Sequence, residues 1–124
     1  MQIKKILLVD DEVEFTALLR AYLQAQEGYL VYEVNKAREA KAAALSFKPD
    51  IIFLDLMMPE MDGSEVARCL REDPVTTRIP IVFLTASIRG EEINQSDGLI
   101  GGQHFLSKPL QLDMLKQYVQ KLVE

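Results

Sequence analysis

The sequence lacks any long apolar run. The first apolar stretch, residues 6–9, is interrupted by Asp10, Asp11 and Glu12 well before it reaches the length of a signal peptide's apolar segment. No later run approaches the length of a membrane-spanning helix. The sequence therefore predicts a protein with no membrane partner and a cytoplasmic location.

Cysteine is rare, and an excess of positive charge is lacking. Cys69 is the single cysteine, so the chain can form neither an internal disulfide nor a metal site built from several cysteines. The 14 Lys and Arg residues are outnumbered by 19 Asp and Glu residues, and the net charge of -5 repels a phosphate backbone. We therefore expect no direct binding of nucleic acid by this domain.

Glycine and proline are scarce as well, at 6 and 5 residues, and no tract has a biased composition. This excludes the disordered and fibrous classes. A chain of 124 residues can bury one sizeable core but has little room for a second. We expect one domain, covering residues 1–124.

Five short apolar runs alternate with segments of helical spacing. The runs are residues 5–9, 29–34, 51–54, 81–85 and 104–106. Three helices are marked by apolar stripes: Phe15, Leu18, Leu19 and Tyr22; Ala37, Ala40, Ala44 and Phe47; Leu112, Leu115, Val119 and Leu122. Two further helices are expected, a short one over 65–72 that Pro74 ends and a weaker one over 91–97.

This alternation predicts an α/β fold, because strands joined through helices by short loops form a parallel sheet with right-handed crossovers. Three of the runs are continuously apolar, which is typical of parallel strands covered on both faces. Five units in a chain of this length indicate a single doubly wound (βα)5 sandwich. Its five-stranded parallel sheet is expected to have the flavodoxin-like order 2-1-3-4-5.

Polar residues follow the apolar runs at the points where the strands are expected to end. Asp10 and Asp11 follow the first run and Asp55 the third; Thr85 ends the fourth, and Lys108 follows the fifth. In an open parallel sheet these residues meet at one edge. Each alone has a simpler explanation: a helix cap, an ordinary strand residue or a solvated loop charge.

Three clustered carboxylates repel one another unless a cation lies between them, and oxygen ligands suit Mg²⁺. A carboxylate can also attack a phosphoryl group and form an aspartyl phosphate when positive charge neutralises the transferring oxygens. The Lys108 ammonium and the Thr85 hydroxyl supply suitable partners for those oxygens. The joint placement therefore favours a metal-assisted phosphoryl acceptor.

Four ordered motifs carry a family resemblance. The segments "LLVDDE" (7–12), "DLMMPEMDG" (55–63), "LTA" (84–86) and "FLSKP" (105–109) resemble the motifs of the receiver domain of two-component response regulators. The match spans nearly the whole chain. The resemblance implies a phosphoacceptor switch that promotes its own phosphorylation and slow dephosphorylation without being an enzyme in the usual sense.

The resemblance also assigns roles to residues. Asp55 would accept a phosphoryl group from a sensor histidine kinase, a histidine phosphotransfer protein or a small-molecule donor. Thr85 and Lys108 would each bind a phosphoryl oxygen. The Mg²⁺ ligands would be Asp10, Asp11, Asp55 and the backbone carbonyl of Met57, with Asp10 acting partly through water.

Switching would follow from phosphorylation. The resemblance implies that Thr85 moves toward the phosphoryl group, that the loop 86–90 follows, and that Phe105 fills the vacated space. The surface of the fourth helix, fifth strand and fifth helix would then change its affinity for a downstream effector protein or domain. The Lys108-Pro109 bond is expected to be cis. Whether phosphorylation leads to a homodimer is left open by the sequence.

Two other classes of protein share some of these features. A phosphatase of the haloacid dehalogenase type also uses an aspartyl nucleophile and Mg²⁺, but it needs a second Asp where this chain has Met57, and a cap insertion. A flavodoxin-like cofactor binder needs a phosphate-binding loop after the first strand, where this chain has acidic residues. All five active-site positions carry the expected residue types, so nothing supports a degenerate receiver.

The sequence also bears on the lifetime of the phosphoryl group and on whether the domain stands alone. Met57 cannot orient an attacking water by a useful hydrogen bond, which predicts slow loss of the phosphoryl group. The absence of a linker after the last helix favours a free-standing domain over a fragment of a multidomain regulator or hybrid kinase, and that alternative stays open.

Overall fold

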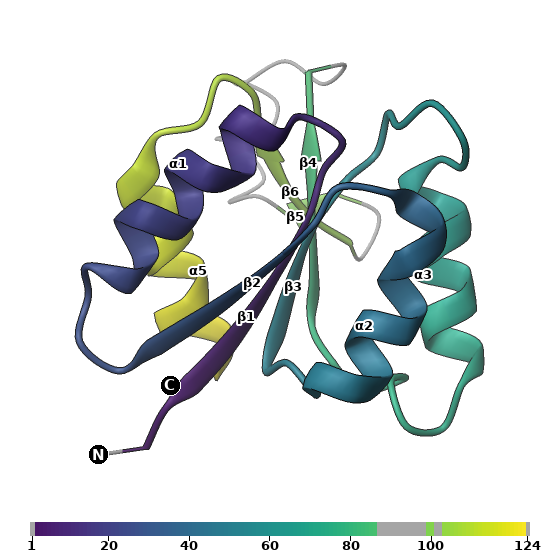
Figure 1. Cartoon of the computed structure of the whole chain (residues 1–124), viewed down its shortest axis with the longest axis horizontal. Helices are drawn as coiled ribbons and strands as arrows, with labels where there is room; N and C mark the ends of the chain where they lie inside the picture. Colours follow the sequence, from purple (N-terminus) through teal and green to yellow (C-terminus); the bar gives the residue numbers. More distant parts are fainter. Residues whose placement is uncertain (1, 87–98, 101–102, 124) are drawn as a thin grey trace.

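The computed structural model describes residues 2–86, 99–100 and 103–123, which form a central sheet between two layers of helices (Figure 1). The strands are β1 (Lys4–Val9), β2 (Tyr29–Val34), β3 (Ile51–Asp55), β4 (Ile81–Thr85), β5 (Leu99–Ile100) and β6 (Gln103–Ser107). The helices are α1 (Val13–Gln24), α2 (Ala40–Phe47), α3 (Gly63–Glu72) and α5 (Leu112–Val123), and a 3-10 turn, η1 (Ala37–Glu39), precedes α2. Within the described ranges, no helix has both the length and the apolar character to cross a membrane.

The strand order β2-β1-β3-β4-β6-β5 confirms the predicted sheet. The pairs β1 to β2, β1 to β3, β3 to β4 and β4 to β6 are all parallel, so the fifth predicted strand is β6. The short strand β5 was not predicted. It pairs antiparallel with β6, and two residues are too few to give a periodic signal. The helix expected over 91–97 lies outside the described residues.

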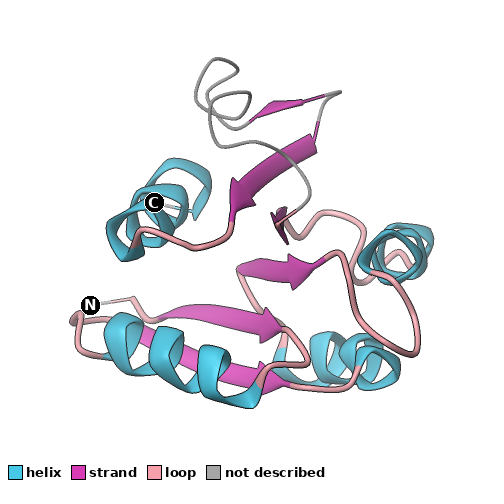
Figure 2. Ribbon diagram, turned by 90° about the horizontal axis from the view of Figure 1, so that it is seen from above, coloured by secondary structure: helices cyan, strands magenta, loops and turns pink. Residues whose placement is uncertain are grey.

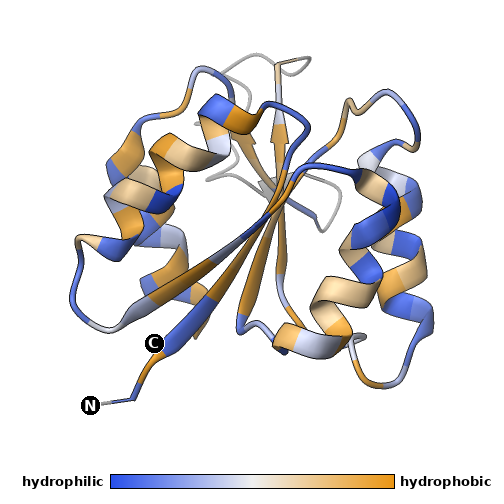
Figure 3. Ribbon diagram, viewed as in Figure 1, coloured by the Kyte–Doolittle hydropathy of each residue, from blue (hydrophilic) through white to orange (hydrophobic). Residues whose placement is uncertain are grey.

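The core lies on both faces of the sheet, with α1 and α5 on one face and α2 and α3 on the other (Figures 1 and 2). Successive residues of β3 supply the two faces in turn: Ile51 and Phe53 belong to the cluster with α1 and α5, whereas Ile52 and Leu54 belong to the one with α2 and α3. Both faces of a central strand must therefore be apolar, as the hydropathy of the strands illustrates (Figure 3). This explains the uninterrupted apolar runs.

The inward face of α1 differs from the predicted stripe. Leu18 is 56% exposed, whereas Thr16, Leu19 and Leu23 are buried. Thr16 occupies an inward position because its hydroxyl donates a hydrogen bond to Glu33 Oε1 at 2.7 Å. The spacing of apolar residues does not reveal a buried polar residue. The predicted inward face of α1 is therefore displaced by about one residue.

Candidate functional site

The carboxyl ends of the parallel strands gather five of the residues singled out in the sequence. Asp10 follows β1, Asp55 ends β3, and Thr85 ends β4; all three are at most 3% exposed. Thr85 pairs in register with Ser107 of β6, and its carbonyl accepts a hydrogen bond from the backbone N–H of Lys108 at 2.9 Å. The adjacent strand ends thus bring Lys108 to the same edge.

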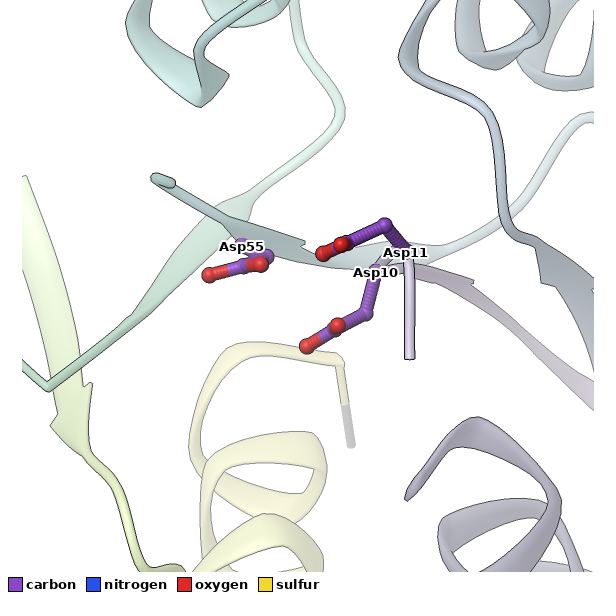
Figure 4. A group of neighbouring side chains, drawn as sticks. All are labelled: Asp10, Asp11 and Asp55. Atoms are coloured by element: carbon purple, nitrogen blue, oxygen red, sulfur yellow. The ribbon is translucent and has the colours of Figure 1, made fainter. Parts of the chain in front are cut away.

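Three carboxylates meet there (Figure 4). Asp10, Asp11 and Asp55 each offer an oxygen, and these atoms lie within 4.8 Å of one another. Asp11 is the least buried of the three. Two of the carboxylates are therefore enclosed by protein, and the third lies on the side that is open to solvent.

Lys108 is the cation of the cluster. Its Nζ lies 2.7 Å from Asp10 Oδ2, 3.2 Å from Glu12 Oε1 and 3.6 Å from Asp55 Oδ1. Its side chain is only 15% exposed. The Lys108-Pro109 bond is cis, as expected. Among the described residues, one ammonium thus pairs with several carboxylates, and their negative charge exceeds its positive charge.

The pKa values of these groups reflect burial first and neighbouring charges second. Burial, followed by the negative charge of Asp10, raises the pKa of Asp55 from 3.8 to about 6, although Lys108 opposes the shift. Burial also raises the pKa of Asp10, more than its hydrogen bond to Lys108 lowers it. For Lys108, burial lowers the pKa, but the bonds and charges of its carboxylate partners outweigh burial and raise it. Burial and the neighbouring carboxylate therefore both disfavour the charged form of Asp55 in the absence of another cation.

The donor set fits Mg²⁺. Within the part of the chain that the structure describes, the cluster offers carboxylate oxygens, which are hard ligands, and its three carboxylates outnumber the one ammonium beside them. A divalent ion bound by these oxygens would offset the burial and the repulsion that together raise the pKa of Asp55. The backbone carbonyl of Met57 stays a predicted fourth ligand.

Replacing Asp55 by Asn is expected to stabilise the metal-free protein at about pH 8 by about 1–3 kcal/mol. The pKa of Asp55 is raised from 3.8 to about 6 on folding, so the folded state holds the proton more tightly than the unfolded chain. This contribution to stability is complete at acidic pH and is lost as the pH rises through about 6.

Urea unfolding with a chelator at about pH 5 and about pH 8 measures the effect. The advantage of Asp55→Asn over the wild type should shrink at the lower pH. Adding Mg²⁺ at the higher pH should also shrink it, because only the wild type keeps all three carboxylates. An Asn variant that is less stable than the wild type at both pH values would contradict the account.

Met57 and Phe105, the other two predicted site residues, lie in different settings. The backbone N–H of Met57 donates to Asp55 Oδ1 at 3.3 Å, while its side chain is 70% exposed. Phe105 is half-buried on β6, and its ring lies 5.4 Å from that of Phe83 between centroids. Phe105 is thus packed against the α2 and α3 side of the core.

Sequence reasoning missed a polar network behind Asp10. The side-chain amide of Asn35 donates to the Asp10 carbonyl at 2.8 Å and to Thr16 Oγ1 at 2.9 Å. Thr16 in turn donates to Glu33, which also pairs with Arg20 at 3.2 Å. The network joins the end of β1 to α1 and β2. No sequence signal indicates it, because its members are scattered over separate elements.

Gly63 was also missed. A Cβ atom added at this residue would lie 2.3 Å from the Asp55 carbonyl oxygen and 2.9 Å from the Leu56 Cα atom. The Gly63 N–H donates to the Leu56 carbonyl at 2.8 Å. The start of α3 is thus packed against the backbone that carries Asp55, and only glycine leaves room for it. The sequence signal that could have indicated Gly63 is its position directly after Asp62, the N-cap residue of α3.

Comparison with known proteins identifies the family. The model of the response regulator receiver domain matches residues 6–120. The chain belongs to this family. Receiver domains are regulatory signalling domains of two-component systems and not classical enzymes. The match therefore decides against a phosphatase of the haloacid dehalogenase type and against a cofactor-binding protein of the flavodoxin type.

Several relatives support the assignment. The receiver domain is 40% identical over 107 residues to the phosphate regulon transcriptional regulatory protein PhoB of Pseudomonas aeruginosa, covering 86% of this chain and 45% of PhoB. It is 45% identical over 106 residues to the transcriptional regulatory protein ResD of Bacillus subtilis, covering 85% of this chain and 42% of ResD. The response regulator PleD of Caulobacter vibrioides is 43% identical over 122 residues, 95% of this chain and 26% of PleD.

A solved structure agrees in fold. The chemotaxis protein CheY4 of Vibrio cholerae superposes with a TM-score of 0.81 at 29% identity, covering 98% of this chain and 99% of CheY4. In contrast, the chain spans less than half the length of PhoB, ResD and PleD. The receiver domain thus resembles both a protein of its own length and parts of longer regulators.

Proposed function

We propose that residues 1–124 form a phosphoacceptor switch in which Asp55 receives a phosphoryl group. The observation that supports the proposal is the setting of the Asp55 carboxylate. Asp55 ends a buried strand, and one of its carboxylate oxygens lies within 4.8 Å of carboxylate oxygens of Asp10 and Asp11. The Lys108 ammonium lies 3.6 Å from Asp55 Oδ1. This arrangement supplies a nucleophile together with groups that can neutralise transferring oxygens.

In the proposed step, an Asp55 carboxylate oxygen attacks the phosphorus atom of the donor. The new O–P bond forms as the P–N bond of a phosphohistidine, or the P–O bond of a small acyl phosphate, breaks. The departing imidazole or carboxylate keeps the bonding electron pair. Bound Mg²⁺, held by Asp10, Asp11, Asp55 and the Met57 carbonyl, would neutralise charge on the phosphoryl oxygens.

Lys108 and Thr85 would then hold the product. Lys108 already lies between Asp10 and Asp55, so a short movement brings its ammonium to a phosphoryl oxygen. The Thr85 hydroxyl would bind another oxygen from the end of the neighbouring strand β4. Movement of Thr85 would allow Phe105 to change rotamer and alter the surface that includes β6, α5 and the predicted fourth helix.

The partners follow from this role. A sensor histidine kinase or histidine phosphotransfer protein would donate the phosphoryl group, in the cytoplasm, and a downstream effector protein or domain would respond. PhoB and ResD are transcriptional regulatory proteins by name. The net charge of -5 favours an effector reached by protein contact over DNA binding by this domain.

Incubation with a small-molecule acyl phosphate and Mg²⁺, followed by intact mass measurement, tests the proposal. The wild type should gain one phosphoryl group, and both the Asp55→Asn variant and a sample with chelator should gain none. No gain by the wild type, under conditions that phosphorylate another receiver domain, would overturn the proposal. Equal gain by Asp55→Asn would place the acceptor elsewhere.

Met57→Asn is expected to shorten the lifetime of the phosphoryl group by about tenfold. The exposed Met57 side chain offers only a weakly accepting thioether sulfur, whereas an amide there can orient a water by a hydrogen bond worth about 1 kcal/mol. A time course of phosphate release from both proteins measures this. Met57→Leu is the matched control and should keep the long lifetime. Unchanged release from Met57→Asn would mean that Met57 only fills space.

A further inference from the structure

The Lys108 ammonium has an aromatic neighbour as well as carboxylate partners. Its Nζ lies 4.7 Å from the centroid of the Phe15 ring. Asp10, Glu12 and Asp55 provide the carboxylates around it. A cation at this distance from a ring is attracted by the negative face of the π system. Lys108 is therefore held by two kinds of contact at once.

A lysine side chain needs such contacts to hold its ammonium in one place. Its ammonium is a point charge on a flexible four-carbon stem, and fixing that stem loses rotamer entropy. The nearest carboxylate is Asp10, at 2.7 Å, and Glu12 lies on the exposed side at 3.2 Å. Both compete with Asp55, at 3.6 Å. Carboxylate contacts alone therefore do not favour the position nearest Asp55.

Phe15 is itself well fixed. It lies in the first turns of α1, half-buried, and packs against the cluster of α1, α5 and the sheet. Phe15 and Lys108 also line one surface groove together with Leu18 and Ala86. Without the ring, water in this groove would reach the ammonium, and the attraction between Lys108 and its partners would be screened more strongly.

We propose that Phe15 is a positioning residue for Lys108, and that its ring face keeps the ammonium where it can reach the phosphoryl group on Asp55. This inference rests on the proposed function of Asp55. The ring does not touch the reacting atoms and acts only through Lys108. The ring face, and not merely an apolar side chain of similar size, is what the position requires.

The test is the rate of phosphorylation by a small acyl phosphate in the presence of Mg²⁺. Phe15→Leu should lower the rate about threefold to tenfold, and Phe15→Tyr, which keeps a ring, should restore most of it. In a Lys108→Met background, Phe15→Leu should have little further effect. Tyr22→Leu is the matched control: Tyr22 is another half-buried aromatic residue of α1 in the same cluster, and its loss should leave the rate within about twofold.

A second readout needs no phosphorylation. The side-chain ε-methylene protons of Lys108, identified by the loss of their NMR signal in Lys108→Met, should be shifted upfield by the Phe15 ring current. The shift should disappear in Phe15→Leu and persist in Tyr22→Leu. Thermal unfolding of each variant verifies that it is folded before the rates are compared.

The outcomes separate the two claims. A wild type that is never phosphorylated overturns the proposed function. A wild type that is phosphorylated normally, with Phe15→Leu equally fast and the Lys108 protons unshifted, overturns only the positioning role. The positioning role would also be overturned if Phe15→Leu lowered the phosphorylation rate by the same factor in the wild-type and Lys108→Met backgrounds. The ring would then act on the fold and not through the ammonium.

Discussion

Gly63→Ala is expected to lower the free energy of unfolding by about 2–4 kcal/mol and to slow phosphorylation of Asp55. The added methyl group would lie 2.3 Å from the Asp55 carbonyl oxygen and 3.0 Å from its carbonyl carbon, and neither atom can rotate away. Helix propensity has the opposite sign, because Ala is better than Gly in a helix by about 1 kcal/mol. The steric effect should dominate, since it requires the backbone that carries Asp55 to move.

Urea unfolding with Ser64→Ala as the control measures the effect. Ser64 is the next residue of α3, is exposed, and its hydroxyl donates a hydrogen bond to Asp62. Its loss should change stability by less than about 1 kcal/mol. A Gly63→Ala protein at least as stable as the wild type would show that the start of α3 can shift freely, and it would contradict the close packing described above.

Lys108→Met is expected to reduce the rate of phosphorylation by about 100-fold without unfolding the protein. Methionine keeps the length and the apolar stem but removes the charge that lies 2.7 Å from Asp10 and 3.6 Å from Asp55. Because Lys108 lowers the pKa of both carboxyl groups, its loss should raise the pKa of Asp55 further above about 6. More of the nucleophile would then be protonated at neutral pH.

The two parts of this prediction are measured separately. The rate comes from mass measurement with the acyl phosphate donor, and the pKa of Asp55 from a ¹³C NMR titration of its carboxyl group without metal. Lys108→Arg is the control, because it keeps the charge but changes the shape, and it should lose less activity than Met. A Met variant with a normal rate and an unchanged Asp55 pKa would remove Lys108 from the proposed mechanism.

The sequence predicted the sheet well because its signal is local. Each parallel strand is a short apolar run, and the polar residue that ends it, such as Asp55 or Thr85, marks the functional edge. Register then follows from topology: Asp55 pairs with Leu84, and Thr85 with Ser107. The gathering of Asp10, Asp55 and Lys108 could therefore be predicted from the strand ends alone.

What escaped prediction depends on contacts between distant residues. Asn35 bonds to the carbonyl of Asp10, 25 residues away in the sequence, and the Phe15 ring faces an ammonium at residue 108. Such pairs depend on how side chains of separate elements meet, and no periodicity encodes them. The displaced inward face of α1 has the same origin, because buried Thr16 is held by Glu33 of β2.

The central claim is that Asp55 itself carries the phosphoryl group, and chemical trapping tests it most directly. Borohydride reduces an aspartyl phosphate to homoserine, so a protein treated with acyl phosphate and Mg²⁺, reduced and digested, can be read by peptide mass spectrometry. We predict homoserine at residue 55 and aspartate at residues 10 and 11, with no homoserine when Mg²⁺ is chelated. Homoserine at another residue, or at none while a second receiver domain is labelled in parallel, would contradict the account.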